Sequence, residues 1–209
     1  AISQGAFVLW NHPAWAVDTC RIHEFQENLF KNKMIHGIEV FNNTEFYPRA
    51  LRWAHEKNLT VFSNSDVHTS IYANDGVHGA GCVAVPYRRP MTIIFAKDRS
   101  QASIKEAMFS RRTLAFFDGY LAGDKQLLMD FCLACLSVSQ IAQNDTHITY
   151  RIDNRYDIPF LLSYGKSKVL LSPNRSLDIK LEKTVDKLKL DLENVFVDEF
   201  QTLSMSLSL

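Results

Sequence analysis

Three successive predicted β-strands contain or precede polar residues of types that bind metal ions. The strand 6–10 is followed by His12, the strand 37–41 contains Glu39 and reaches Asn42, and the strand 59–64 is followed by Asp66 and His68. In parallel α/β proteins the carboxyl ends of the strands form the active face, and residues two apart in an extended chain project to the same side. One carboxylate and two imidazoles that converge there can bind zinc, manganese or iron. Such a metal ion would lower the pKa of bound water and polarise a phosphoryl oxygen.

Each of these residues also has an ordinary structural interpretation. A histidine before a proline is common in turns, a single Asp-x-His sequence is unspecific, and Asp66 can cap the turn or helix that follows. Glu39 lies inside the apolar run 37–41, where an unpaired carboxylate is costly to bury. It therefore requires a cation, and the spacing leaves open whether this is a metal ion or an arginine. Glu39 is accordingly a further candidate ligand.

Strand and helix patterns alternate through the first two-thirds of the chain. Short apolar runs predict strands, and apolar residues at helical spacing predict helices. The predicted strands cover 6–10, 37–41, 59–64, 91–96 and 113–117, and the predicted helices cover 24–35, 47–57 and 100–111. Strands that alternate with helices of this length indicate parallel βαβ units, and hence a sheet or barrel with helices outside.

The pattern changes after about residue 130. Short runs, several of them alternating, are separated by turn signals and cover 147–152, 160–163, 169–171, 177–181, 188–192 and 203–209. A helix over 177–192 is an alternative, but the strict alternation of leucine with polar residues at 187–192 favours a strand. This spacing predicts a small antiparallel sandwich. We therefore expect an α/β domain over residues 1–130 and a β-rich domain over 131–209.

The composition limits the classes of partner. The chain has 23 Lys+Arg and 23 Asp+Glu, a formal net charge of 0. Proteins that bind nucleic acid or a membrane surface need a clustered excess of positive charge, so we expect neither as a partner. No apolar run approaches the ~20 residues that span a bilayer. Cys132 and Cys135 have C-x-x-C spacing but lie in the mostly apolar stretch 127–136, which favours burial over a redox or zinc site.

Three ordered motifs resemble a known superfamily. Residues 10–13 (WNHP), 34–42 (MIHGIEVFN) and 58–68 (NLTVFSNSDVH) look like the second half of a PHP domain, named after polymerase and histidinol phosphatase. Residues 89–98 and 111–117 resemble the segments that follow in its bacterial phosphodiesterase branch. That branch also carries a small β-rich C-terminal domain, so the resemblance covers essentially the whole chain.

The resemblance implies a distorted (β/α)7 barrel that holds two or three divalent metal ions. Such an enzyme hydrolyses phosphodiesters or small phosphate esters with a metal-bound hydroxide. His12 matches the ligand histidine of the HP motif, Asp66 and His68 match the Asp-x-His ligands, and Glu39 matches a frequent acidic position after the HP motif. Members of the branch are often exported, which implies a periplasmic location, with the cytoplasm as the alternative.

The chain departs from the family pattern at its beginning. A PHP domain opens with a His-x-His motif, and no two histidines of this chain are separated by a single residue. We therefore expect a fragment, the second half of a PHP-type barrel followed by the sandwich. Its exposed sheet edges would favour self-association. We expect weak metal binding and little or no turnover from these 209 residues alone.

Two other functions compete with a phosphoesterase. One is a non-catalytic binding or scaffold protein that retains the PHP fold and binds through its β-rich domain; the other is an amidohydrolase or carbohydrate deacetylase with similar ligands. A scaffold has no need of a carboxylate beside an imidazole, and the motif strings resemble PHP proteins, so both are weaker.

Three further residues are candidate substrate contacts. Arg88 and Arg89 can clamp a phosphate group through paired hydrogen bonds, and the alternative, which the sequence favours, is a solvated pair of arginines. His78 lies in the Gly-rich segment 74–81, which is either an active-site lid or an ordinary loop.

Overall fold

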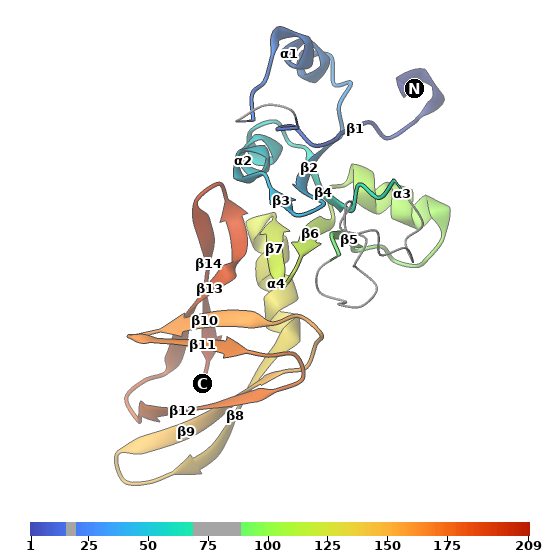
Figure 1. Cartoon of the computed structure of the whole chain (residues 1–209). Coiled ribbons are helices and arrows are strands. Elements are labelled where there is room, and N and C mark those ends of the chain that lie inside the picture. Colours follow the sequence, from blue (N-terminus) through green and yellow to red (C-terminus); the bar gives the residue numbers. More distant parts are fainter. Residues whose placement is uncertain (16–19, 69–88) are drawn as a thin grey trace. The chain divides into compact units, whose positions relative to one another are not determined.

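The computed structural model describes residues 1–15, 20–68 and 89–209, and it divides the chain into two compact units (Figure 1). The first unit comprises Ala1–Asp124 and Val197–Phe200, and the second comprises Lys125–Phe196 and Gln201–Leu209. The main division therefore falls before helix α4 (Lys125–Cys135). The sequence placed it at residue 130, inside this helix, because the apolar stretch there gave no helix signal.

A mainly parallel sheet positions the candidate site in the first unit. Strand β2 is central and pairs in parallel with β1 on one side and with β4 on the other, as the alternating pattern predicted. Strand β3 pairs antiparallel with β2. The elements of this part are the 3-10 helix η1 (Ile2–Gln4), β1 (Leu9–Trp10), α1 (Glu24–Lys31), β2 (Gly37–Asn42), β3 (Glu45–Phe46), α2 (Pro48–Glu56) and β4 (Thr60–Asn64).

The core of this sheet forms around β2, all of whose residues are buried. Helix α2 packs on β2. Its buried residues are Leu51, Trp53 and two alanines. Pro48 occupies the first turn of α2, where the missing N–H has no cost. The Trp53 ring stacks on that of Trp10, with centroids 5.6 Å apart and planes 7° apart, so that α2 also supports β1.

Three antiparallel strands complete the first unit. They are β5 (Met91–Ile94), β6 (Thr113–Phe117) and β7 (Tyr120–Gly123), and helix α3 (Gln101–Phe109) joins β5 to β6. The expectation of parallel strands is wrong here. Asp118 and Gly119 both have positive φ, 46° and 85°, as a tight hairpin requires. This turn reverses the chain directly from β6 into β7, a strand that the sequence analysis missed.

Hydroxyl groups connect β4 to β5 and β6. Thr113 Oγ1 donates to the Val61 carbonyl at 2.7 Å, and Ser63 Oγ donates to the Phe116 carbonyl at 2.9 Å. Thr92 Oγ1 accepts from the Ser63 N–H at 2.9 Å and donates to its carbonyl at 3.0 Å. Within the described residues, the β1–β4 sheet and strands β5–β7 therefore meet through side chains, and they form no closed barrel.

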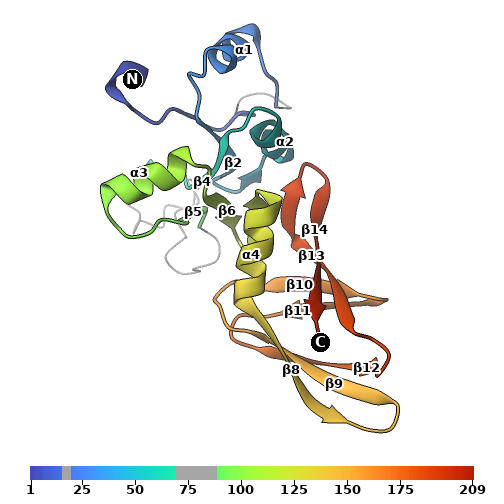
Figure 2. The same cartoon turned by 180° about the vertical axis from the view of Figure 1, so that it is seen from behind.

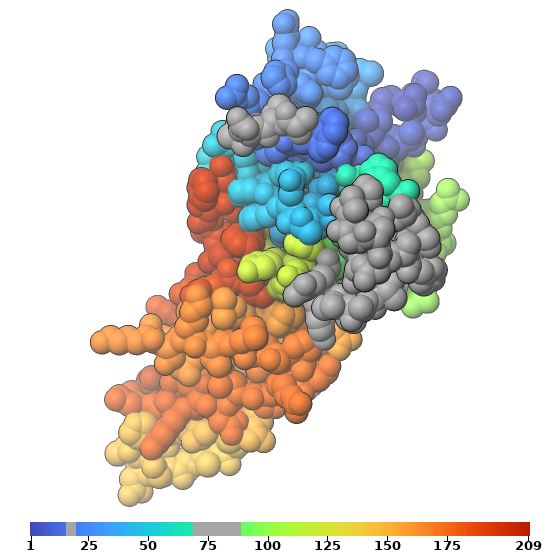
Figure 3. Space-filling model, in the orientation of Figure 1, coloured from blue at the N-terminus to red at the C-terminus, as the bar shows by residue number. Residues whose placement is uncertain are grey.

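The second unit consists of two antiparallel sheets and one helix. One sheet has the order β12–β9–β8, and the other has the order β11–β10–β13 with β14 beside β13. The strands are β8 (Leu136–Gln143), β9 (His147–Asn154), β10 (Phe160–Tyr164), β11 (Ser167–Leu171), β12 (Ser176–Glu182), β13 (Lys187–Asp198) and β14 (Gln201–Ser208). Figure 3 shows the yellow and orange residues of β8 to β12 as one contiguous mass. All six runs predicted as strands in this region are strands.

Helix α4 lies beside β14 (Figure 2) and buries both of its cysteines. Cys132 and Cys135 are free thiols, and burial raises both pKa values, that of Cys135 to about 12. The predicted burial of this C-x-x-C pair is confirmed. No helix in the described part of the chain has the length and apolar character needed to cross a membrane.

We predict that Thr113→Val lowers the free energy of unfolding by about 1 kcal/mol, because the buried hydroxyl bond to Val61 is lost while the side-chain volume is kept. Urea denaturation measures this change. Thr146→Val, in an exposed turn, is the matched control and should change stability by less than ~0.5 kcal/mol. Equal effects of the two substitutions would show that the hydroxyl bonds to β4 contribute nothing.

Candidate functional site

The ends of the three parallel strands carry backbone strain. Each strand is followed within two residues by a non-glycine residue with positive φ: His12 (29°) after β1, Asn43 (51°) after β2 and Asp66 (51°) after β4. This conformation costs roughly 1–2 kcal/mol per residue for most side chains. Such residues persist only where the surrounding structure determines them, and they concentrate at functional sites. Two of the three are the residues that the sequence analysis proposed as metal ligands.

A β-bulge in β2 determines which side chains meet at this edge. The pairing of β2 with β4 shifts between Glu39 and Phe41, so that Val40 is an extra residue. In a regular strand, residues three apart face opposite sides. The extra residue brings the Asn42 side chain to the same side as Glu39, where the two form a hydrogen bond.

The Glu39 carboxylate is buried, with 1% of the residue exposed, and it accepts hydrogen bonds from three N–H groups. Oε2 accepts from the His12 main-chain N–H and from Asn42 Nδ2 at 3.0 Å, and Oε1 accepts from Asn64 Nδ2 at 2.6 Å. Burial raises the pKa of Glu39, and these hydrogen bonds act in the opposite direction. The sequence analysis expected a metal ion or an arginine beside Glu39; in the described residues, main-chain and amide N–H groups stabilise it instead.

One of these hydrogen bonds restrains the main chain of His12. The His12 N–H is bound to Glu39, and the His12 carbonyl accepts from the Trp15 N–H at 2.9 Å. Both ends of the turn are therefore fixed. The His12 imidazole lies 5.7 Å from the Trp15 ring, measured between centroids, with the planes 54° apart.

Asp66 and His68 lie together after β4. Asp66 Oδ1 and His68 Nε2 are 3.3 Å apart, and both side chains are partly exposed. The sequence analysis expected these side chains on the same side of an extended chain. They do meet, although Asp66 is left-handed rather than extended.

Asp66 and His68 supply the oxygen and nitrogen donors that suit zinc, manganese or iron. Catalytic zinc sites use three protein ligands, and in the described ranges no group of three or more His, Cys, Asp or Glu residues lies close enough to hold a metal ion. The described residues therefore fit such an ion in donor chemistry and provide part of a ligand set.

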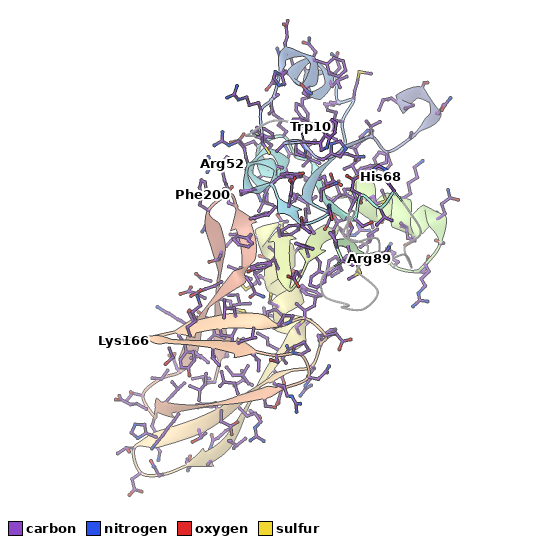
Figure 4. All side chains as sticks on the ribbon, in the orientation of Figure 1. Trp10, Arg52, His68, Arg89, Lys166 and Phe200 are labelled. Carbon is purple, nitrogen blue, oxygen red and sulfur yellow. The ribbon has the colours of Figure 1, made fainter. Side chains whose placement is uncertain are left out.

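The candidate substrate contacts are only partly described. Arg89 is half-buried and is separated from the start of β5 by Pro90 (Figure 4). Arg88, His78 and the Gly-rich segment 74–81 lie outside the described residues.

Asn42 was noted at a strand end, but neither it nor Asn64 was predicted as part of the site. Both end an apolar strand, and an amide at such a position can hydrogen-bond a neighbouring carboxylate. Their placement at two strand ends was the available signal. The bulge that brings Asn42 to Glu39 leaves no pattern in the sequence, because alternation alone places the two residues on opposite faces.

Comparison with known proteins gives one informative match. No protein-family model matches the chain, and no curated protein matches it. A crystal structure from Bacteroides vulgatus ATCC 8482 is similar over the whole of this chain, with a TM-score of 0.87 and 29% identity. That structure is of a two-domain protein containing a predicted PHP-like metal-dependent phosphoesterase. This chain has a PHP-like fold. It spans 63% of the length of that protein.

We predict that Glu39→Ala lowers the free energy of unfolding by about 3 kcal/mol, because three N–H groups lose their acceptor in or beside the core. Glu39→Gln should have a smaller effect, since its carbonyl oxygen still accepts while its NH2 group faces a donor. Chemical denaturation with far-UV circular dichroism measures both.

Glu56→Ala is the control for this comparison. Glu56 is an exposed acid at the end of α2, and its loss should change stability by less than ~0.5 kcal/mol. If Glu39→Ala lowers the free energy of unfolding no more than Glu56→Ala does, the assigned role of the buried carboxylate is contradicted.

Proposed function

We propose that this chain forms part of a metal-dependent phosphoesterase that hydrolyses phosphodiesters or small phosphate esters. The observation that carries the proposal is the contact between Asp66 and His68 at the carboxyl end of β4, where Asp66 has a strained backbone. The similarity to the Bacteroides vulgatus protein supports the class of enzyme. The donor types support a divalent metal ion, which can be zinc, manganese or iron.

In this proposal His12, Asp66 and His68 are ligands of a centre of two or three metal ions. Metal ions, when bound, lower the pKa of water and polarise the phosphoryl group. Within the chain, Glu39 positions His12 through its main-chain N–H. The Asp66 carboxylate holds the His68 ring. Glu39 is already hydrogen-bonded to three donors, so we assign it a positioning role rather than a ligand role.

The rest of the ligand set belongs, in this proposal, to residues outside the described ranges. Two observations support this: the described residues supply fewer than three clustered ligands, and the chain spans 63% of the similar protein. We propose that the first unit is the second half of a PHP-type barrel. A periplasmic location and self-association through open sheet edges belong to the same proposal.

We predict that the chain binds Zn²⁺ or Mn²⁺ weakly and that Asp66→Ala/His68→Ala raises the dissociation constant at least about tenfold, a loss of ~1.4 kcal/mol. Isothermal titration calorimetry with the metal salts measures this without turnover. Hydrolysis of bis(p-nitrophenyl) phosphate by the chain alone should stay below ~1 s⁻¹, the lower end of typical enzymes.

The chain contains a matched control for the double substitution. Asp145, in the turn after β8, and His147, the first residue of β9, have the same Asp-x-His spacing. Asp145→Ala/His147→Ala should leave the dissociation constant unchanged. Equal weakening by the two double variants, or none by either, would contradict the proposed site.

A further inference from the structure

A cavity of about 490 Å³ lies beside His12 in the first unit. One wall comes from the segment that runs from β1 to Trp15, and the other comes from Arg21 and the start of α1. His12 is part of the lining. The cavity therefore borders a proposed metal ligand.

Among the described residues, the lining of this cavity includes an arginine and no carboxylate. The cation of this lining is Arg21, whose guanidinium group is always charged. No carboxylate of the described residues pairs with Arg21. A guanidinium group binds two phosphate oxygens through parallel hydrogen bonds. The charge of the cavity is thus suited to a phosphate group.

A second cavity extends the positive surface. It has a volume of about 580 Å³, shares Arg21 and His23 with the first cavity, and adds Arg49 and Arg52. Those two arginines are paired with acids: Arg49 Nε lies 3.2 Å from Glu199 Oε1, and Arg52 lies 3.1 Å from the same carboxylate. Of the three arginines described in these two linings, Arg21 is consequently the one left available to a ligand of the His12 cavity.

Trp15 gives the His12 cavity a planar apolar wall. Trp15 is 69% exposed, and the only ring contact described for it is the tilted one with His12. Trp10, in the same lining, is by contrast already stacked on Trp53 (Figure 4 labels Trp10). A large aromatic ring left in water gains from stacking with another planar ring. The wall is therefore suited to an aromatic group rather than to an aliphatic one.

We propose that this cavity binds an aryl phosphate ester, with the phosphate at Arg21 beside His12 and the aromatic ring stacked on Trp15. Trp15 is then a specificity-determining residue, which selects substrates whose alcohol part is planar and aromatic. The inference rests on the proposed function, because it takes the bound phosphate ester as the group that is hydrolysed. Binding itself requires only the described residues of the cavity.

The test compares phenyl phosphate with cyclohexyl phosphate, which has a ring of similar size but no planar face. Titration of the 209-residue chain by calorimetry in EDTA removes any contribution from metal ions. We expect phenyl phosphate to bind about tenfold or more tightly than cyclohexyl phosphate, and inorganic phosphate to bind most weakly. Equal binding of the two esters, or binding of neither, would overturn the proposal.

Substitutions at Trp15 and Arg21 separate the stacking of the aromatic ring from the binding of the phosphate. Trp15→Ala should abolish the difference between the two esters, Trp15→Phe should retain most of it, and Arg21→Gln should weaken both esters equally. Phe200→Ala removes an aromatic ring that is 83% exposed outside the cavity and should change nothing. Retained selectivity in Trp15→Ala would overturn the proposal.

The outcome of this test is separate from that of the metal titration. Selectivity for phenyl phosphate in EDTA, together with no loss of metal binding in Asp66→Ala/His68→Ala, would support the cavity and contradict the proposed metal site. Equal binding of the two esters in EDTA, together with loss of metal binding in Asp66→Ala/His68→Ala, would contradict the proposed cavity and support the proposed metal site. Trp15 and Arg21 are exposed, so their substitution removes no core packing. Circular dichroism of the variants checks that they fold like the unchanged chain.

Discussion

The buried carboxylate of Glu39 is the interaction on which the candidate site depends. It binds N–H groups of His12, Asn42 and Asn64, and so joins the carboxyl ends of β1, β2 and β4. A buried carboxylate is stable only when its oxygens are satisfied. The bulge at Val40 makes this possible, because without the extra residue Asn42 would face away from Glu39. One acidic residue thereby fixes three strand ends relative to one another.

These hydrogen bonds explain how the strained main chain of His12 can be kept in one conformation. A metal ligand must be positioned within about 0.5 Å, and an exposed turn does not provide that by itself. The main chain of His12 is held at both its N–H and its carbonyl, and Asp66 is held by its contact with His68. The same turn carries Trp15 into the cavity, so that one short segment would supply both a metal ligand and a wall for the substrate.

The sequence predicted the regular elements well and the irregular ones poorly. The runs that became β2, α2 and β4 were found because their patterns are strong. By contrast, β7 was missed although Asp118-Gly119 signalled a hairpin, and α4 was missed because its apolar residues follow no clear helical stripe. For the site, strand-end spacing made His12, Asp66 and His68 candidates, and the structure brings two of them, Asp66 and His68, together. The partners of Glu39 were beyond prediction, because a bulge changes which residues share a face and leaves no periodic signal.

The most direct measurement is the position of a bound metal ion. Crystals of the chain soaked in Mn²⁺ and measured for anomalous scattering would give it. We expect a peak at bonding distance from the donor atoms of Asp66 and His68, with Glu39 still bound to its three N–H partners. A peak on the Glu39 carboxylate with those hydrogen bonds broken, or no peak at Asp66 and His68, would contradict this expectation.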